Sequence, residues 1–460
     1  MDNSCLIVGL PGATAGRNGE AGRLPSPRRP VLHPCPRTTP ANMLGACYVS
    51  LFVIDRRRFC EIMVAAPAVA MSAGRKPNAP LSHGKIEQVE NGLMQMREGK
   101  LVKLNVPLLE RMQHYHVPGF SVAVIDECRI AWTKGYGVLE HGTPERVTPD
   151  TLFASGSISK PVSATAALAL VERGHLHLDA DVNTELRSWK VPENEFTKSE
   201  KVTLRRLLSH SAGLNEAGAP SFAVGEPSFT ALQTLDAQPP TDWTPPYREA
   251  KPVRVQAIPG SRFLYSPGGY AILTVLMEDI ERKPFETILQ KTVLDRVGMR
   301  SSTFAEPLPD YLLERATTEH KDGQPLEGKR RYFPGLAAGG LWTTPADLAK
   351  FAIEIMSSWV GKSHRILSPA SVKEMLTCQV GHYDAKTGGQ GLGFWVQGQG
   401  NGFVFAHKGG TYGSSCQLVG FPIVGQGAIV MANDRPGGER LVPEALFAIG
   451  TAYGWPWDLA

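Results

Sequence analysis

Residues 153–174 read FASGSISKPVSATAALALVERG and join a Ser-x-x-Lys sequence to a long apolar helix that Gly174 ends. A serine at the start of a helix lies beside free backbone N–H groups and the positive end of the helix dipole, which favour a developing negative charge. Lys160 is three residues further on and therefore lies on the same face, within reach of the Ser157 hydroxyl. Burial would lower the pKa of this lysine and let it act as a general base. The sequence thus predicts a nucleophile and its base, the alternative being that Ser157 only caps the helix.

A second candidate element is the sequence PGSRFLYSPGGY at residues 259–270, which leads into another apolar helix. The glycine-rich turn after Tyr265 allows its phenol to approach a different segment of the chain. A phenol beside a lysine ammonium can lose its proton and serve as a base or a proton shuttle. We therefore expect Tyr265 to act with Lys160, the alternative being an ordinary tyrosine of the core or of a loop.

A third element is FAHKGG at residues 405–410, between two candidate strands. A histidine at such a position can face inwards, and the glycines after it allow another backbone to come close. We expect His407 to line the site and Gly409 and Gly410 to lie beside the substrate. A backbone N–H near Gly410 would pair with that of Ser157 as an oxyanion hole.

In this order, the three elements resemble the motifs of the serine β-lactamase and penicillin-binding protein superfamily. The resemblance is to its class C β-lactamase-like branch, which includes family VIII carboxylesterases and D-Ala-D-Ala carboxypeptidases. Two further stretches are similar, VTLRRLLSHSAGL at 202–214 and AAGGLWTTPADL at 337–348, so the resemblance covers about residues 85–455. Within them we expect His210 and Asp347 to make helix caps and structural contacts.

The resemblance implies both a fold and a set of roles. The fold is α/β, with an antiparallel sheet built from both chain ends and flanked by helices, plus a mostly helical lobe. Ser157 would be the acylated nucleophile, and Lys160 and Tyr265 would share the proton transfers. His407 would take the place of the lysine in the usual Lys-Thr-Gly motif.

Two departures from the family pattern bear on the substrate. The usual Tyr-x-Asn is Tyr-Ser-Pro at residues 265–267, and Pro267 has no side-chain amide with which to bind a β-lactam or a peptide. A literal Lys-Thr-Gly begins at Lys386, but it lies in a polar glycine-rich loop, so we prefer His407 as the third motif. The other Ser-x-x-Lys sequence, Ser82 to Lys85, lies in a polar stretch where nothing would bury the lysine.

The pattern along the chain predicts one catalytic domain after an extension. Residues 1–82 are expected to be disordered or targeting-like, and residues 83–460 to form the β-lactamase-like domain. Within that domain, a sheet part would comprise about 83–156 and 350–460, and a helical part about 157–349.

Apolar spacing also predicts individual elements. Helices are expected over 85–97, 108–115 and 441–453. Phe120–Ile125 and Arg129–Trp132 read as a β-hairpin, and the chain after Gly391 reads as strand-rich.

Composition excludes several classes of function. Residues 1–80 hold ten Lys/Arg and four Asp/Glu and so carry a charge of +6, whereas the whole chain carries +4. Residues 81–460 therefore carry −2, and no nucleic-acid partner is expected. No apolar run reaches about 18 residues, so we expect no membrane span. The seven cysteines and two His-x-His sequences have no metal-site spacing, and no nucleotide-binding fingerprint occurs, so no metal or cofactor is expected.

The function expected from the sequence is that of a serine hydrolase that forms an acyl-enzyme on Ser157. A carboxylesterase acting on small esters is the first expectation, because of Pro267. The alternatives are a β-lactamase, a D-amino-acid peptidase, or a non-catalytic protein that binds acyl or penicillin-like ligands. The partner would be a small ester or amide, and export and the oligomeric state stay open.

Overall fold

The computed structural model describes residues 81–98, 100–217, 221–226, 229–238, 251–381 and 388–457. All of these residues fall in one of the chain's two compact units, Ile62–Ala460. The expected extension lies outside the described residues up to residue 80, and so do Lys386 and Thr387 of the literal Lys-Thr-Gly.

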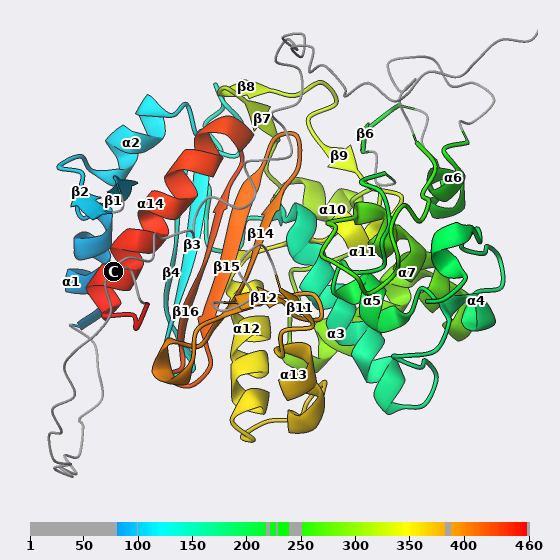
Figure 1. Cartoon of the computed structure of the whole chain (residues 1–460). Helices are drawn as coiled ribbons and strands as arrows, with labels where there is room; N and C mark the ends of the chain where they lie inside the picture. The colour runs from blue at the N-terminus through cyan, green and yellow to red at the C-terminus, as the bar shows by residue number, and fades with distance from the viewer. Residues whose placement is uncertain are drawn as a thin grey trace, which may run out of the picture. The chain divides into compact units, whose positions relative to one another are not determined.

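An eight-stranded sheet, antiparallel at every pairing, forms the centre of the fold, in the order β11-β12-β13-β14-β15-β16-β3-β4 (Figure 1). The hairpin of β3 and β4 comes early in the chain, yet β3 pairs with β16 near the end. The predicted hairpin and the predicted sheet from both chain ends are therefore confirmed. The strand bounds are β3 Gly119–Asp126, β4 Arg129–Gly137, β11 Val380–Gly381, β12 Gly388–Gln390, β13 Trp395–Gln397, β14 Val404–Gly410, β15 Ser415–Phe421 and β16 Gln426–Ala432.

Both faces of this sheet are apolar, because successive side chains of a strand point to opposite faces. In β3, Phe120, Val122 and Val124 belong to one core cluster, whereas Ala123 and Ile125 belong to the other. Helices cover both faces. Those on the first face are α1 Leu81–Glu90, α2 Leu108–His114 and α14 Arg435–Tyr453, and α12 Pro345–Trp359 lies on the second.

The helical lobe lies beyond the second face and is built around two long helices, α3 Ser159–Glu172 and α7 Pro267–Glu281. In α3 every residue from 159 to 170 is buried, so this helix runs through the core. The other helices and turns are α4 Val182–Glu185, η3 Glu195–Thr197, α5 Leu204–Leu208, α6 Ala231–Asp236, α8 Phe285–Leu289, η4 Gln290–Leu294, α9 Asp295–Val297, α10 Asp310–Leu313, α11 Leu336–Gly339, α13 Pro369–Met375 and η5 Gly400–Gly402.

Short strand pairs complete the fold. Their bounds are β1 Met94–Arg97 with β2 Lys100–Lys103, β5 Phe153–Ala154 with β10 Trp342–Thr343, β6 Phe222–Ala223 with β9 Arg331–Tyr332, and β7 His320–Lys321 with β8 Gln324–Pro325.

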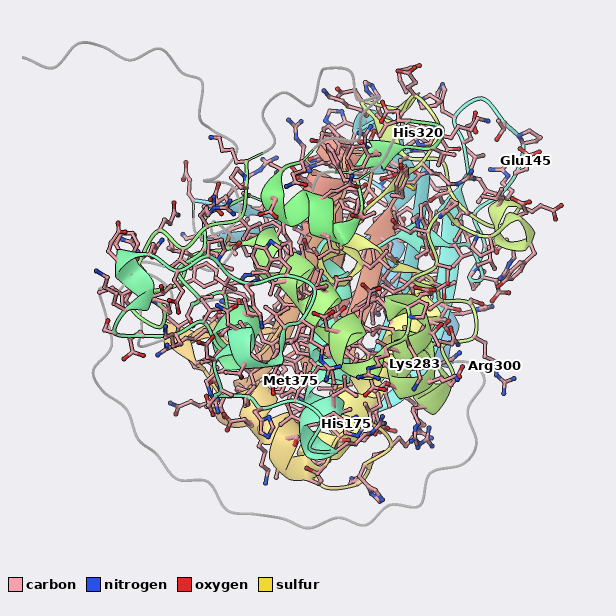
Figure 2. The ribbon with its side chains drawn as sticks, turned by 90° about the vertical axis from the view of Figure 1, so that its right-hand side faces the viewer. Glu145, His175, Lys283, Arg300, His320 and Met375 are labelled. Carbon is pink, nitrogen blue, oxygen red and sulfur yellow. The ribbon has the colours of Figure 1, made fainter. Side chains whose placement is uncertain are left out.

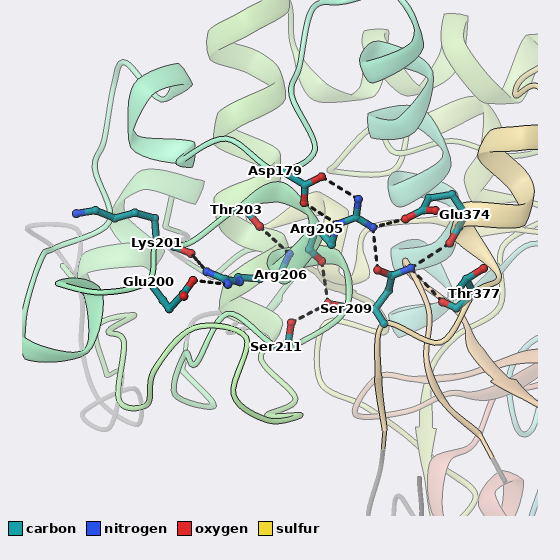
Figure 3. Close-up of polar contacts among 11 residues, drawn as sticks. Asp179, Glu200, Lys201, Thr203, Arg205, Arg206, Ser209, Ser211, Glu374 and Thr377 are labelled. Carbon is teal, nitrogen blue, oxygen red and sulfur yellow. Dashed lines mark hydrogen bonds and ion pairs between the residues drawn. The ribbon is translucent and has the colours of Figure 1, made fainter. Parts of the chain in front are cut away.

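A partly exposed ion-pair network ties α5 to the segment around α13 (Figure 3). The Arg205 guanidinium donates to both carboxylate oxygens of Asp179, at 2.6 and 2.9 Å. It also donates to Glu374 and, at 2.8 Å, to the side-chain oxygen of Gln379. A planar guanidinium can hold several acceptors at once, so Arg205 joins three segments that are distant in sequence.

The helix predicted over 85–97 was wrong in its second half. Helix α1 ends at Glu90, and Met94–Arg97 forms β1 instead. Asn91-Gly92 separates the two elements, and a Cβ at Gly92 would lie 2.2 Å from the Gln88 carbonyl oxygen. The chain-closing helix also starts six residues before the predicted Leu441, because the Asp434 side chain caps it by accepting from the Gly437 N–H.

Candidate active site

Ser157 lies in a short 3-10 turn, η2 Gly156–Ile158, immediately before α3. It is partly exposed, whereas the residues on either side of it are buried. Two flanking serines fix this turn to Leu341: the Ser155 Oγ donates to the Leu341 carbonyl at 2.8 Å, and the Leu341 N–H donates to the Ser159 Oγ at 3.0 Å. The small polar residues around Ser157 therefore anchor the turn and leave its own hydroxyl available.

The capping alternative for Ser157 is wrong. Ile158 occupies the position before α3, and no side chain caps the helix there. The Ser157 Oγ instead lies within hydrogen-bond distance of two other side chains, Lys160 and Tyr265.

Lys160 points from the first turn of α3 at Ser157, as its spacing predicts. Its Nζ lies 2.9 Å from the Ser157 Oγ and donates to the Ala338 carbonyl at 2.7 Å. The side chain is buried, with 1% of its surface exposed. Because burial penalises the charged ammonium, the pKa of Lys160 falls from 10.5 to about 7. A large fraction of the lysine is therefore a neutral amine near pH 7, which is the form that can accept a proton.

Tyr265 comes from the loop before α7, and its hydroxyl donates to the Ser157 Oγ at 3.0 Å. Burial raises the pKa of this phenol to about 12, although the hydrogen bond with Ser157 opposes the shift. Of the two roles expected for Tyr265, base and proton shuttle, the raised pKa favours the shuttle, because the phenol keeps its proton in the resting site. Desolvation acts on both groups, so that near pH 7 about half of Lys160 is neutral while Tyr265 keeps its proton.

His407 lies in β14, opposite Leu418 of β15, and is partly buried. Its Nδ1 lies 2.6 Å from the Lys408 carbonyl oxygen. A carbonyl only accepts, so Nδ1 carries the proton and Nε2 carries a lone pair. Burial, and after it the charge of Lys160, lower the pKa of His407 to about 3. The histidine is therefore neutral near pH 7.

The two glycines after His407 bring β14 against the Ser157 turn. A Cβ at Gly409 would lie 2.1 Å from the Ser155 carbonyl oxygen, and a Cβ at Gly156 would lie 2.3 Å from that of Gly410. The backbones therefore touch directly, as the expected oxyanion hole requires. The structure brings together all the residues singled out in the three motifs.

Two residues expected to be structural have different surroundings. The Asp347 carboxylate accepts from the Ser301 N–H at 2.8 Å and from the Ser302 hydroxyl at 2.9 Å, which are structural contacts. His210, in contrast, lies against Tyr265, with ring centroids 4.3 Å apart. Sequence reasoning missed this contact and also missed the Ala338 carbonyl that holds Lys160. The small residues of AAGG at 337–340 were the available signal, since they permit close backbone approach.

Both histidines of the His-x-His sequence at 175–177 lie beside carboxylates. His175, which Figure 2 labels, pairs with Glu281 at 2.7 Å. His177 pairs with Glu185 at 2.7 Å. Among the described residues, no three His, Cys, Asp or Glu side chains gather as metal ligands. Within the same residues, no helix is both long and apolar enough to cross a bilayer.

This fold is that of penicillin-binding proteins and AmpC-type D-alanine carboxypeptidases. The chain belongs to the β-lactamase family, whose model matches residues 108–451. Membership of this family supports the general assignment of the protein as a serine hydrolase.

Individual relatives agree with the family. Penicillin-binding protein 4 of Amycolatopsis lactamdurans is 28% identical over 341 residues, which are 70% of this chain and 82% of the relative. The fold is similar to that of an octameric penicillin-binding protein homologue from Pyrococcus abyssi, with a TM-score of 0.57, 24% identity and coverage of 75% and 76% of the two chains. It is also similar to that of the D-alanine carboxypeptidase AmpC from Burkholderia cenocepacia, with a TM-score of 0.58, 19% identity and coverage of 80% and 99%.

Proposed function

We propose that the protein is a serine hydrolase that acts on small carboxylic esters through an acyl-enzyme on Ser157. The observation that carries the proposal is the convergence of two proton carriers on one hydroxyl. Lys160 Nζ and the Tyr265 hydroxyl lie 2.9 and 3.0 Å from the Ser157 Oγ. A protein that only bound acyl ligands would have no use for a nucleophile with a neutral base and an acid beside it.

The protonation states suggest how acylation proceeds. Neutral Lys160 takes the Ser157 proton while the Oγ attacks the ester carbonyl and forms the new C–O bond. The carbonyl oxygen becomes an oxyanion, to which the N–H groups of Ser157 and Gly410 donate. When the intermediate collapses, the bond to the alcohol breaks and the Tyr265 phenol protonates the departing alkoxide. The Lys160 ammonium then returns the proton to Tyr265, which restores both groups.

Deacylation reverses these roles with water as the nucleophile. Lys160 accepts a proton from the attacking water, and the tetrahedral intermediate forms again in the same oxyanion hole. As it collapses, the Ser157 Oγ leaves and recovers a proton through Lys160 or Tyr265, which releases the carboxylic acid. No group beyond the three side chains, the backbone N–H donors and water is needed for this cycle.

An ester is favoured over a β-lactam or a peptide by two substitutions in the motifs. Pro267 is the first residue of α7 and offers no donor or acceptor from its side chain. His407 is neutral, whereas the family's lysine supplies a positive charge. β-Lactams and peptides with a free C-terminus carry a carboxylate at neutral pH, so they gain from such a charge. Neutral esters have no carboxylate to be recognised.

A D-amino-acid peptidase or a β-lactamase is the second candidate. It is favoured by the name of the relative with 28% identity, penicillin-binding protein 4. It is also compatible with a histidine at residue 407, because histidine variants of the third motif occur among the peptidase members of the family. The two candidates share the acylation chemistry and differ in what the substrate carries beside its carbonyl.

The test compares kcat/KM for three substrates in parallel: p-nitrophenyl butyrate, a cephalosporin and an acetylated D-Ala-D-Ala peptide. We expect the ester to be turned over at least about 100-fold more efficiently than the other two, and Ser157→Ala to abolish its turnover. The double variant Pro267→Asn, His407→Lys should raise cephalosporin acylation relative to ester turnover. Faster turnover of the peptide or the cephalosporin by the unmodified protein would replace the ester assignment with the second candidate.

A further inference from the structure

We propose that His210 is a positioning residue that holds the Tyr265 phenol on the Ser157 hydroxyl. This inference rests on the proposed function, in which Tyr265 is the acid of the acylation step. His210 belongs to the VTLRRLLSHSAGL stretch and is itself buried, with 2% of its surface exposed. It touches no reacting atom in the proposed mechanism and acts only through the tyrosine.

His210 holds the backbone on both sides of Tyr265. The N–H of Leu264 donates to the His210 carbonyl oxygen at 2.7 Å. The N–H of Ser266 donates to the His210 Nδ1 at 3.2 Å. The residues before and after the tyrosine are therefore bound to the same partner, which fixes the direction in which the Tyr265 side chain leaves the loop.

The imidazole also fixes the tyrosine ring itself. The ring centroids of His210 and Tyr265 lie 4.3 Å apart with an interplanar angle of 37°. The Tyr270 ring packs on the His210 ring, with 5.3 Å between their centroids. The Tyr270 hydroxyl donates to the Leu208 carbonyl oxygen at 3.0 Å. The phenol thus rests on an aromatic support that is anchored in α7 and α5.

The backbone of His210 is held in a conformation that costs free energy. Its φ is 53°, in the left-handed region that side chains with a Cβ rarely adopt. Such a conformation persists where the surrounding structure determines it, and it is common beside functional sites. Here it lets one residue present both its carbonyl oxygen and its Nδ1 to the segment 264–266.

This arrangement has a direct consequence for the reaction. The proposed proton transfer needs the Tyr265 hydroxyl at its observed 3.0 Å from the Ser157 Oγ. A misplacement of about 1 Å in a reacting group lowers a rate by about 100-fold. Loss of either the acceptor or the ring of His210 should therefore slow acylation without changing the groups that perform it.

Two substitutions separate the parts of this contact. His210→Asn keeps an acceptor near the Nδ1 position and tolerates the left-handed backbone, but it removes the ring. His210→Phe keeps a ring and removes the acceptor. We expect each to lower kcat for p-nitrophenyl butyrate by about 10- to 100-fold, with a smaller change in KM, while thermal melting confirms that the variant is folded.

The decisive measurement repeats both substitutions in a Tyr265→Phe background. The Tyr265→Phe variant lacks the phenol hydroxyl. If His210 acts by positioning that hydroxyl, substituting His210 in this variant should lower kcat further by less than about threefold. Equal losses of kcat in the two backgrounds would overturn the inference and assign His210 a structural role. Failure of the unmodified protein to acylate Ser157 would instead overturn the proposed function itself, so the two failures are distinguishable.

Discussion

The backbone of Gly156 lies directly against that of Gly410. Gly156 has a φ of 49°, and a Cβ on it would lie 2.3 Å from the Gly410 carbonyl oxygen. This contact joins the turn that carries Ser157 to the end of β14, and it puts two backbone segments that are distant in sequence within reach of one bound carbonyl group. The proposed oxyanion hole depends on it.

Substitution of Gly156 should therefore damage both stability and activity. In Gly156→Ala, the new Cβ has no room and the backbone conformation is strained, so we expect a loss of about 2 kcal/mol or more and at least a 100-fold fall in kcat/KM. The matched control is Gly174→Ala, because Gly174 also has a left-handed φ, of 73°, but no atom lies within 4 Å of its Cβ position. That variant should lose about 1 kcal/mol and keep its activity. Urea unfolding and ester hydrolysis check both, and equal activity of the two variants would contradict the account.

The pH dependence of acylation should follow Lys160. Its pKa is about 7, and only the neutral amine accepts the Ser157 proton, so kcat/KM should rise with pH to a midpoint near 7 and then level off. The phenol of Tyr265, with a pKa of about 12, should cause no fall before about pH 10. A midpoint near the ordinary lysine value of 10.5 would refute the assignment of the base.

His407 provides the control for that profile. Burial and Lys160 lower its pKa to about 3, so this histidine does not titrate in the range where the midpoint is expected. His407→Gln should therefore keep the midpoint near that of the unmodified protein, whatever its effect on the maximum rate. If kcat/KM of His407→Gln no longer rose with pH around 7, the histidine would be the titrating group.

Burial of Lys160 should also be visible in the stability of the protein. Between about pH 7 and 10.5 the unfolded lysine holds a proton that the folded lysine has lost, so the free energy of unfolding rises with pH. The slope is at most about 1.4 kcal/mol per pH unit for one group. In Lys160→Met this contribution is absent, so the stability of the variant relative to the unmodified protein should fall as the pH rises from 7 to 9. Urea unfolding at both pH values measures it, and a pH-independent difference would show that the lysine is not desolvated.

The third motif is tested by comparing His407 with Lys386. We expect His407→Ala to lower kcat/KM for the ester by about tenfold or more, because a side chain close enough to Lys160 to interact with its charge is lost and leaves a cavity. Lys386→Ala should stay within about twofold. The reverse order of effects would move the third motif to the literal Lys-Thr-Gly sequence.

Much of the fold could be predicted because its strands and long helices have regular periods. The apolar run Phe120–Ile125 predicted a strand of a hairpin, and in the structure this strand places Phe120 and Val122 in one core cluster and Ala123 in the other. Helix α1 was extended too far, because the four residues of β1 are too few to show a period and are stabilised by pairing with β2. Local spacing carries no information about such a partner.

The site was predictable as a set of residues but not in its protonation states. The three-residue spacing between Ser157 and Lys160 fixes their contact within one helix turn. The state of Tyr265 depends on its burial by segments far along the chain, and this burial raises the pKa of the phenol to about 12. The same holds for His210, whose role depends on contacts with residues 264–266 that no local pattern reveals.

Intact-mass spectrometry of the protein mixed with a fluorophosphonate, with a p-nitrophenyl ester and with a cephalosporin tests the central claim most directly. We expect one fluorophosphonate adduct per chain, which peptide mapping assigns to Ser157, and a short-lived acyl adduct with the ester. The adduct should be absent in Ser157→Ala and unchanged in Ser82→Ala, the serine of the other Ser-x-x-Lys sequence. An adduct on Ser82, or none with any of the three reagents, would contradict the assignment of Ser157 as the nucleophile.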